Sequence, residues 1–134
     1  MPAAAATANL KLLVVDDSQF ARNRIQRALA LRAVRKVIVA SNGVEALAMF
    51  QREQPQLVTM DLTMPELDGI GATTEMVRLQ PDVRILVVSA LADKATAIEA
   101  LKRGANGFLL KPFTDAQLND ALTVMMRASP YGRE

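Results

Sequence analysis

The sequence predicts an α/β fold in which one parallel β-sheet is covered by helices on both faces. Three observations lead to this prediction: five short apolar runs recur along the chain, helical patterns lie between and after them, and 134 residues suit one compact domain. Most of the runs are nearly continuous in apolar residues instead of alternating, which is typical of strands buried on both faces. Crossovers in such a sheet are nearly always right-handed.

The apolar runs are the predicted strands, and the periodic segments are the predicted helices. We expect the strands at residues 10–15, 36–39, 57–60, 84–88 and 107–110, and the helices at 18–32, 43–53, 69–79, 93–103 and 115–127. Because 51% of the residues are hydrophobic but only 4% are aromatic, the shared core must be mainly aliphatic.

Local signals mark where several helices begin and end. Asn42 with Glu45, and Thr114 with Gln117, have the spacing of a capping box, in which side chains satisfy free backbone N–H groups. Gly104 is a stop signal for the fourth helix.

Helical spacing also predicts which side chains face the core. Each predicted set forms one stripe along its helix. The sets are Ala21, Ile25, Ala28 and Leu29 in the first helix; Val44, Leu47, Ala48 and Phe50 in the second; Ala95, Ile98 and Leu101 in the fourth; and Leu118, Ala121, Leu122 and Met125 in the fifth.

The terminal segments and the composition predict the cellular location of the protein and the classes of partner it lacks. Residues 1–9 are Ala-rich and uncharged and do not resemble a signal peptide, so we expect a disordered leader of a cytoplasmic protein. Residues 10–127 are expected to form the domain and 128–134 a frayed tail. No apolar run reaches the roughly 18–20 residues of a membrane span, and the net charge is only +2, so we expect neither membrane nor nucleic acid as a partner.

The sequence contains neither cysteine nor histidine. Disulfides and thiolate metal sites are therefore excluded, as are the usual zinc ligand and the usual general base. Phosphohistidine cannot form in this chain, so any phosphoryl group must come from another molecule.

A basic run lies between Asp17 and Glu45, where no acid occurs. Its six bases are Arg22, Arg24, Arg27, Arg32, Arg35 and Lys36. Such a run is most often a solvated helix face, but it also suits a docking face for an acidic partner. The sequence leaves both interpretations open.

Charged or hydroxyl residues stand at the carboxyl ends of four predicted strands. Asp16 and Asp17 follow the first strand, Asp61 the third, Ser89 the fourth and Lys111 the fifth. Ligands of open α/β sheets bind at this edge. Each residue alone could be an ordinary cap or turn residue, but together they indicate a site.

The chemistry of this cluster favours phosphoryl transfer. Unit charges 4 Å apart interact by roughly 1–4 kcal/mol, depending on the effective dielectric, so three carboxylates need compensation by Lys111 and a divalent cation. With only oxygen ligands, Mg²⁺ is the expected ion. A carboxylate can attack a phosphoryl group, and such transfer needs positioning and charge neutralisation above all. Asp61 is central among the strands and is the expected nucleophile, while the Ser89 hydroxyl can bond a phosphoryl oxygen.

Four stretches of the chain resemble the receiver domains of two-component response regulators, those of chemotaxis especially. They are residues 12–18 (LLVVDDS), 42–47 (NGVEAL), 60–69 (MDLTMPELDG) and 104–113 (GANGFLLKPF). Each is moderately specific alone. All four occur in order, and the resemblance covers about residues 10–127.

The resemblance implies a flavodoxin-like (βα)5 fold with a five-stranded parallel sheet of order 2-1-3-4-5. It implies that Asp61 accepts a phosphoryl group from a histidine kinase or a histidine phosphotransfer protein. Mg²⁺ is expected on the side chains of Asp17 and Asp61 and the backbone carbonyl of Thr63, with Asp16 acting largely through water. Lys111 is expected to bind the phosphoryl group, and its bond to Pro112 to be cis.

The resemblance also implies a switch. Ser89 is expected to move toward the phosphoryl group while Phe108 turns inward, which changes the surface of the fourth helix, fifth strand and fifth helix for an unknown partner protein. Phe108 replaces the commoner Tyr, and its alternative role is plain packing. Thr63 and Leu91 stand where the family tunes phosphoryl loss, and neither supplies an acid or amide to position water. Arg24 lies where the first helix often has an apolar residue.

Three other interpretations stay open at this point: a phosphorylation-independent adaptor, a Mg²⁺-dependent phosphohydrolase, and the excised receiver of a larger regulator. The presence of every expected site residue disfavours the adaptor. Thr63 stands where the family's enzymes carry a second Asp, which disfavours the hydrolase. We therefore expect no enzyme activity beyond the chain's own phosphorylation and dephosphorylation.

Overall fold

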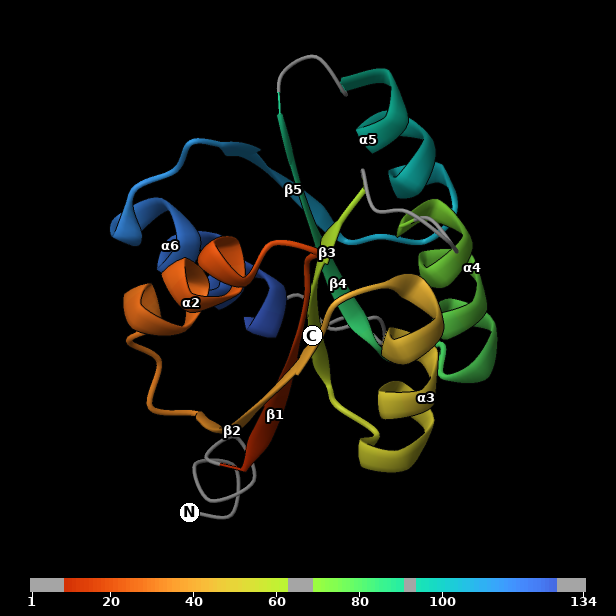
Figure 1. The fold of residues 1–134 in the computed structure, drawn as a ribbon, viewed down its shortest axis with the longest axis horizontal. Helices are drawn as coiled ribbons and strands as arrows, with labels where there is room; N and C mark the ends of the chain where they lie inside the picture. Colours follow the sequence, from red (N-terminus) through yellow and green to blue (C-terminus); the bar gives the residue numbers. More distant parts are fainter. Residues whose placement is uncertain (1–8, 63–68, 91–93, 128–134) are drawn as a thin grey trace.

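The computed structural model describes residues 9–62, 69–90 and 94–127. Strands and helices alternate along it, as predicted (Figure 1). The elements are β1 (Leu10–Val15), α2 (Gln19–Ala28), β2 (Val34–Ala40), α3 (Gly43–Glu53), β3 (Leu57–Asp61), α4 (Gly69–Leu79), β4 (Arg84–Ala90), α5 (Lys94–Lys102), β5 (Gly107–Lys111) and α6 (Asp115–Arg127). Within these described parts, no helix has both the length and the apolar character that crossing a membrane requires.

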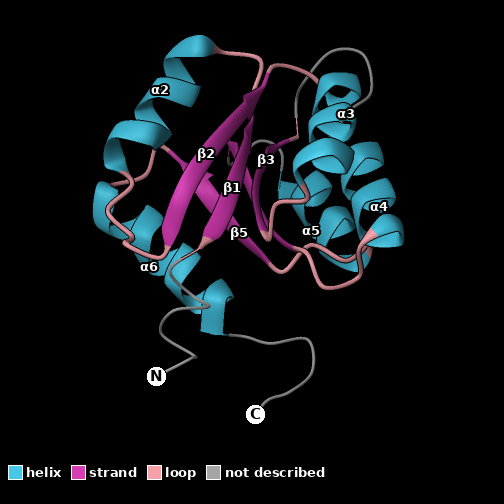
Figure 2. Cartoon of the chain, turned by 90° about the horizontal axis from the view of Figure 1, so that it is seen from below, coloured by secondary structure: helices cyan, strands magenta, loops and turns pink. Residues whose placement is uncertain are grey.

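One parallel sheet runs through the centre of the molecule. Its strand order is β2-β1-β3-β4-β5, which confirms the predicted order 2-1-3-4-5. Helices α2 and α6 cover one face of the sheet, and α3, α4 and α5 cover the other (Figures 1 and 2). The predicted α/β fold class is therefore confirmed.

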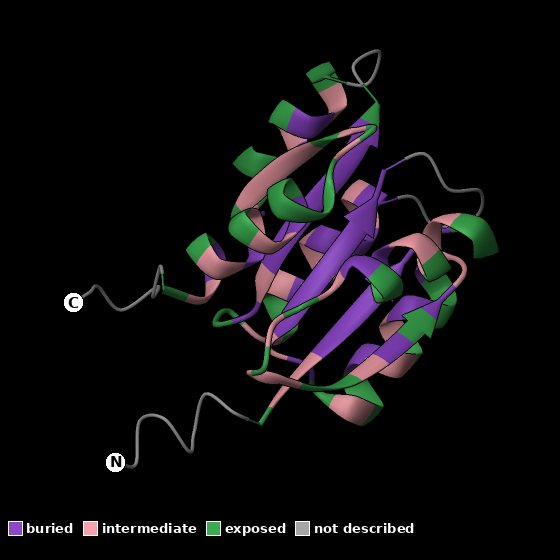
Figure 3. Ribbon diagram, turned by 90° about the vertical axis from the view of Figure 1, so that its left-hand side faces the viewer, coloured by how far each residue is buried: buried purple, intermediate pink, exposed green. Residues whose placement is uncertain are grey.

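Each face of the sheet has its own apolar core, and neighbouring residues of one strand alternate between the two. In β1, Leu12 and Val14 pack toward α2 and α6, while Leu13 and Val15 pack toward α3, α4 and α5. The central strands are buried on both faces (Figure 3), which explains why their sequences are nearly continuous in apolar residues.

The predicted caps are present. The backbone N–H of Gln117 donates to Thr114 Oγ1 at 3.0 Å, and that of Thr114 donates to Gln117 Oε1 at 2.9 Å. At α3, Asn42 accepts from the Glu45 N–H at 2.7 Å, but the Glu45 carboxylate accepts from the Ser41 N–H at 2.6 Å. The capping box of Asn42 and Glu45 is thus shifted by one residue, because Glu45 accepts from the N–H of Ser41 instead of that of Asn42.

Gly104 ends α5 with a φ of +116°, a conformation that side chains with a Cβ rarely adopt. The N–H groups of Gly104 and Ala105 bond the carbonyls of Leu101 and Ala100, which is the Schellman arrangement. A Cβ on Gly104 would lie 2.9 Å from Val77 Cγ2, so α4 also requires glycine here.

The predicted inward stripe is confirmed for α6 and, at Ile25 and Ala28, for α2, where Ala21 is only half-buried and Leu29 lies beyond the helix end. The prediction is wrong in part for α3. In α3, Gly43, Ala46 and Phe50 are buried, whereas Val44 is 59% exposed and Ala48 is exposed as well. Phe50 is the largest side chain of the helix, and the small residues before it let the first turn approach the sheet. The stripe is therefore rotated relative to the prediction.

The prediction for α5 is wrong for a similar reason. Ala97 and Ala100 face the core, while Ile98 and Leu101 are 46% and 40% exposed, and Ala95 is exposed too. Both pairs have the same spacing, so periodicity could not choose between them. The alanines let α5 pack closely and leave large apolar side chains at the surface.

Helix α2 also ends earlier than predicted, at Ala28. Leu29 has an extended backbone, with φ −65° and ψ 124°. The N–H of Ala30 then donates to Asn119 Oδ1 at 2.8 Å instead of continuing the helix. A tertiary bond from α6 therefore ends this helix.

Candidate phosphoryl site

The register of the sheet brings the predicted residues to one edge. Asp16 and Asp61 directly follow paired residues of β1 and β3, so they lie level with each other. Asp61 pairs with Val88, which places Ser89 one residue beyond it, and Lys111 is the last residue of β5.

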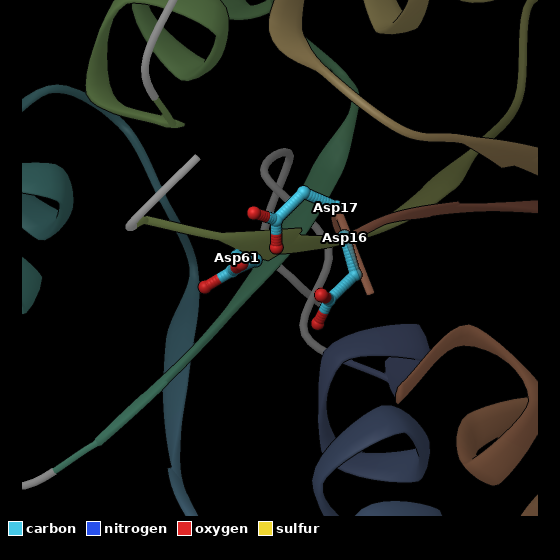
Figure 4. A group of neighbouring side chains, drawn as sticks. All are labelled: Asp16, Asp17 and Asp61. Atoms are coloured by element: carbon cyan, nitrogen blue, oxygen red, sulfur yellow. The ribbon is translucent and has the colours of Figure 1, made fainter. Parts of the chain in front are cut away.

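Three carboxylates converge at this edge, Asp16 and Asp17 from the end of β1 and Asp61 from the end of β3 (Figure 4). One oxygen from each lies within 4.8 Å of the others. Asp16 and Asp61 are only 2% and 3% exposed, whereas Asp17 is open to solvent. Two of the three acids are thus buried together, which needs compensation.

Lys111 supplies part of that compensation. Its Nζ lies 3.1 Å from Asp16 Oδ2 and 3.9 Å from Asp61 Oδ1. Three ionised carboxylates against one ammonium leave two negative charges. A divalent cation would neutralise them, and an all-oxygen donor set suits Mg²⁺.

The residues present fit such an ion. Ligands on opposite sides of Mg²⁺ lie about 4.2 Å apart, close to the 4.8 Å within which the three oxygens fall. Both oxygens of Asp16 already accept bonds, Oδ1 from the Ser18 N–H at 2.9 Å and Oδ2 from Lys111. Direct coordination of an ion by Asp16 would therefore compete with these two bonds. Thr63, the remaining predicted ligand, lies outside the described residues.

The backbone around the acids is held from two directions. Arg22 Nη1 donates to the Asp16 carbonyl at 2.8 Å, which fixes the loop between β1 and α2. Gly69, the first residue of α4, packs against the end of β3, where a Cβ would lie 2.5 Å from the Asp61 carbonyl oxygen. A residue with a side chain at position 69 would displace this end of β3.

Comparison with known proteins decides the family. The family model described as the response regulator receiver domain matches residues 12–123. The chain belongs to this family. It is 38% identical over 112 residues to the chemotaxis protein CheY of Thermotoga maritima, which covers 84% of the chain and 93% of that protein. It is also 38% identical over 117 residues to a probable transcriptional regulator, ycf27, of Porphyridium aerugineum, but spans only 48% of that protein.

Solved structures agree with this assignment. The receiver domain of NtrX from Brucella abortus superposes with a TM-score of 0.82 at 28% identity, over 88% of this chain and 99% of that one. The CheX-CheY-BeF3-Mg+2 complex from Borrelia burgdorferi gives a TM-score of 0.80 at 25% identity, over 87% of this chain and 89% of that one. These likenesses confirm the predicted resemblance to receiver domains.

The two residues predicted to form the receiver domain's switch have different surroundings. Ser89 is 1% exposed, and its hydroxyl donates one long hydrogen bond, 3.4 Å, to the carbonyl of Ala90. Phe108 is half-buried and packs against the core beneath α3, α4 and α5. Leu91 lies outside the described residues. The Lys111–Pro112 bond is cis, as predicted.

The basic run of the receiver domain proves to be mostly engaged within the domain. Arg22 bonds Asp16 as described above, and the other internal pairs are Arg24–Asp115, Arg35–Asn9 and Lys36–Glu53. Arg27 and Arg32 are exposed at the surface. Most of this charge therefore serves internal contacts, which weakens the docking interpretation.

Sequence reasoning did not assign a role to Arg24, although it flagged this arginine as a departure from the family. Arg24 bonds the segment that follows Lys111 and lies over the ring of Phe113. These side chains line a groove of about 460 Å³ between α2 and residues 111–113. Phe20, which is 74% exposed, also lines the groove.

Proposed function

We propose that this receiver domain accepts a phosphoryl group on Asp61 from the phosphohistidine of a histidine kinase or phosphotransfer protein. The observation that carries the proposal is the convergence of three carboxylates and Lys111 at one edge of the sheet. Because the chain contains no histidine, the donor is a second molecule.

In the proposed step, a carboxylate oxygen of Asp61 attacks phosphorus. A P–O bond forms while the P–N bond to the donor's imidazole breaks, and the imidazole nitrogen keeps the electron pair. Lys111 Nζ, 3.9 Å from Asp61 Oδ1, is placed to balance the charge of the transferred group. Water later attacks the acyl phosphate and releases phosphate. We propose no turnover of any other substrate.

Mg²⁺ would be held by Asp17 and Asp61 with the Thr63 carbonyl, and by Asp16 largely through water. When bound, the ion would supply neutralisation of the phosphoryl oxygens. The similarity to CheY in the Borrelia burgdorferi complex with BeF3 and Mg²⁺ supports this assignment.

The proposed output is a change in the surface formed by α5, β5 and α6. The long Ser89 hydrogen bond is easily exchanged for one to a phosphoryl oxygen, and Phe108 would turn inward as Ser89 moves. Large apolar side chains that a partner protein could cover are already exposed on these elements: Ile98, Leu101, Leu110 and Val124. The presence of CheX in the Borrelia burgdorferi complex is consistent with a protein partner. We propose that this phosphoryl transfer takes place in the cytoplasm, where histidine kinases find the ATP that serves as their phosphoryl donor.

Phosphorylation by acetyl phosphate tests the proposal directly. Incubation with acetyl phosphate and Mg²⁺ should add one labile phosphoryl group, detected by intact-mass spectrometry. Asp61→Ala and chelation by EDTA should each abolish the gain. Asp120→Asn removes an exposed acid of α6 and should retain it.

The other outcomes separate the competing functions. No gain in mass with acetyl phosphate or with a phosphorylated histidine phosphotransfer protein would contradict the proposal and support an adaptor. Sustained release of many phosphate ions per chain would instead support a phosphohydrolase.

A further inference from the structure

Lys111 stands at a weakly supported point of the fold. It is the last residue of β5, an edge strand that, among the described residues, pairs with β4 alone. None of the five residues of β5 is fully buried. Lysine also has a long flexible side chain, so local packing alone does not fix its ammonium group.

Arg24 binds the segment that follows Lys111 at two points. Its Nη2 donates to the carbonyl of Phe113 at 2.8 Å, and its Nη1 lies 2.8 Å from Asp115 Oδ1. The guanidinium also lies over the Phe113 ring, 5.0 Å from the centroid. One side chain from α2 thus holds residues two and four positions beyond Lys111.

The same helix also holds the other half of the site. Arg22, two residues before Arg24, bonds the carbonyl of Asp16, the acid that Lys111 contacts at 3.1 Å. Helix α2 therefore bridges the acidic loop and the lysine segment. Both arginine contacts thus come from one helix and reach the two sides of the Lys111–Asp16 pair.

Surface stabilisation alone would be a weak reason for Arg24. Asp115 is 69% exposed, and ion pairs that exposed contribute little to stability. The bond to the Phe113 carbonyl and the stacking on its ring are more directional than this ion pair. They therefore fix the backbone two residues after the lysine. These contacts favour a role in geometry.

We propose that Arg24 is a positioning residue that sets Lys111 relative to Asp16 and Asp61 during phosphoryl transfer. The proposal rests on the function proposed above. Misplacement of a catalytic group by about 1 Å can slow a reaction by about 10²-fold, so partial loosening should still be measurable.

The test compares Arg24→Met with Arg27→Met, which removes the same charge from an exposed position of the same helix. The second-order rate constant for phosphorylation by acetyl phosphate is measured at saturating Mg²⁺, well below the melting temperature of each variant. Arg24→Met should slow phosphorylation about tenfold, while Arg27→Met should match the wild type. Arg24→Lys keeps a charge near Asp115 but lacks the planar fork, and should give an intermediate rate.

A second readout separates positioning from general damage. The ¹³Cε NMR signal of Lys111, assigned by its loss in Lys111→Arg, should shift or broaden in Arg24→Met and stay unchanged in Arg27→Met. Mg²⁺ affinity, measured by calorimetry, should change less than about twofold, since Arg24 binds Phe113 and Asp115.

The outcomes are distinguishable. Equal rates and equal Lys111 signals in both methionine variants would overturn the positioning role while leaving the proposed function intact. A wild type that takes up no phosphoryl group would instead defeat the proposed function itself. If Arg24→Met proved too unstable to assay, a wild-type rate in a folded Arg24→Lys with an altered Lys111 signal would equally refute the proposal.

Discussion

The two faces of the sheet are held together in different ways. On the α2–α6 side, polar bonds join residues about ninety positions apart in the chain: Arg24 binds Asp115, and Asn119 binds Ala28 and Ala30. On the α3–α4–α5 side, the charged pairs Glu75–Arg78 and Glu99–Arg103 each stay within one helix or its end, and Glu53 joins α3 to Lys11 of β1 and Lys36 of β2. The core there includes small apolar residues such as Ala72, Ala97 and Ala100.

This difference matches the work proposed for each side. Hydrogen bonds are directional and fix one position, whereas apolar contacts are non-directional and tolerate small shifts. The side with polar bonds between its two helices is the one proposed to position Lys111, which must stay in place for phosphoryl transfer. The other side includes α5, whose Ile98 and Leu101 belong to the surface proposed to change.

The largest expected effect is on the α3–α4–α5 side, at Gly104. Gly104→Ala should lower the free energy of unfolding by about 2–4 kcal/mol, because it combines a strained positive φ with a contact to Val77. Urea unfolding measures the loss. Gly107→Ala is the matched control: its Cβ would lie 3.5 Å from Leu86, an ordinary contact, and it should change stability by less than about 1 kcal/mol.

A double variant separates the two causes of that loss. If close packing of α4 and α5 matters, Gly104→Ala should cost about 1 kcal/mol less in a Val77→Ala background, because the contact is relieved. If Gly104→Ala lowered the free energy of unfolding equally in both backgrounds, the whole loss would come from backbone strain. Close packing of α4 against α5 would then not explain it.

On the α2–α6 side, Asn119→Ala should cost about 1–2 kcal/mol, because it removes hydrogen bonds to Ala28 and Ala30. Asn23→Ala, the same change at an exposed position of α2, should be neutral or slightly stabilising. The phosphorylation rate of Asn119→Ala should stay within about twofold of wild type, since these bonds lie at the far end of α2 from Lys111. A loss as large as in Arg24→Met would mean that any bond between α2 and α6 positions the lysine.

The sequence could predict what sheet topology determines, but not what depends on how the helices pack. The convergence of Asp16, Asp17, Asp61 and Lys111 was predictable because parallel topology sends every strand end to one edge, whatever the packing details. The inward face of α5 was not, because Ala97–Ala100 and Ile98–Leu101 share one spacing. The role of Arg24 was not either, because its partners become neighbours only after α2 and α6 pack. The sequence showed an unusual arginine, but not what it binds.

The smallest expected effect concerns Glu45, at the start of α3, which interacts through charge with Arg22 of α2 on the other side of the sheet. The backbone N–H and then the hydroxyl of Ser41 hold the pKa of Glu45 below its ordinary value of 4.5; burial opposes this, and Arg22 of α2 lowers it slightly. A lowered pKa stabilises the fold above the unfolded value, and this stability is lost as pH falls through the folded value. The stability advantage of wild type over Glu45→Gln should therefore shrink below about pH 4.5, and it should be small throughout because Glu45 is exposed.

NMR titration of the Glu45 carboxyl group ranks the causes. Ser41→Ala should raise the pKa of Glu45 more than Arg22→Met does, because a hydrogen-bonded hydroxyl outweighs a charge that acts through solvent. The reverse order would mean that α2 and α3 are coupled through charge across the end of the sheet. The two sides of the sheet would then not behave independently at this edge. A movement of α3 would alter the charge interaction with α2, the helix whose arginines contact Asp16 and the segment after Lys111.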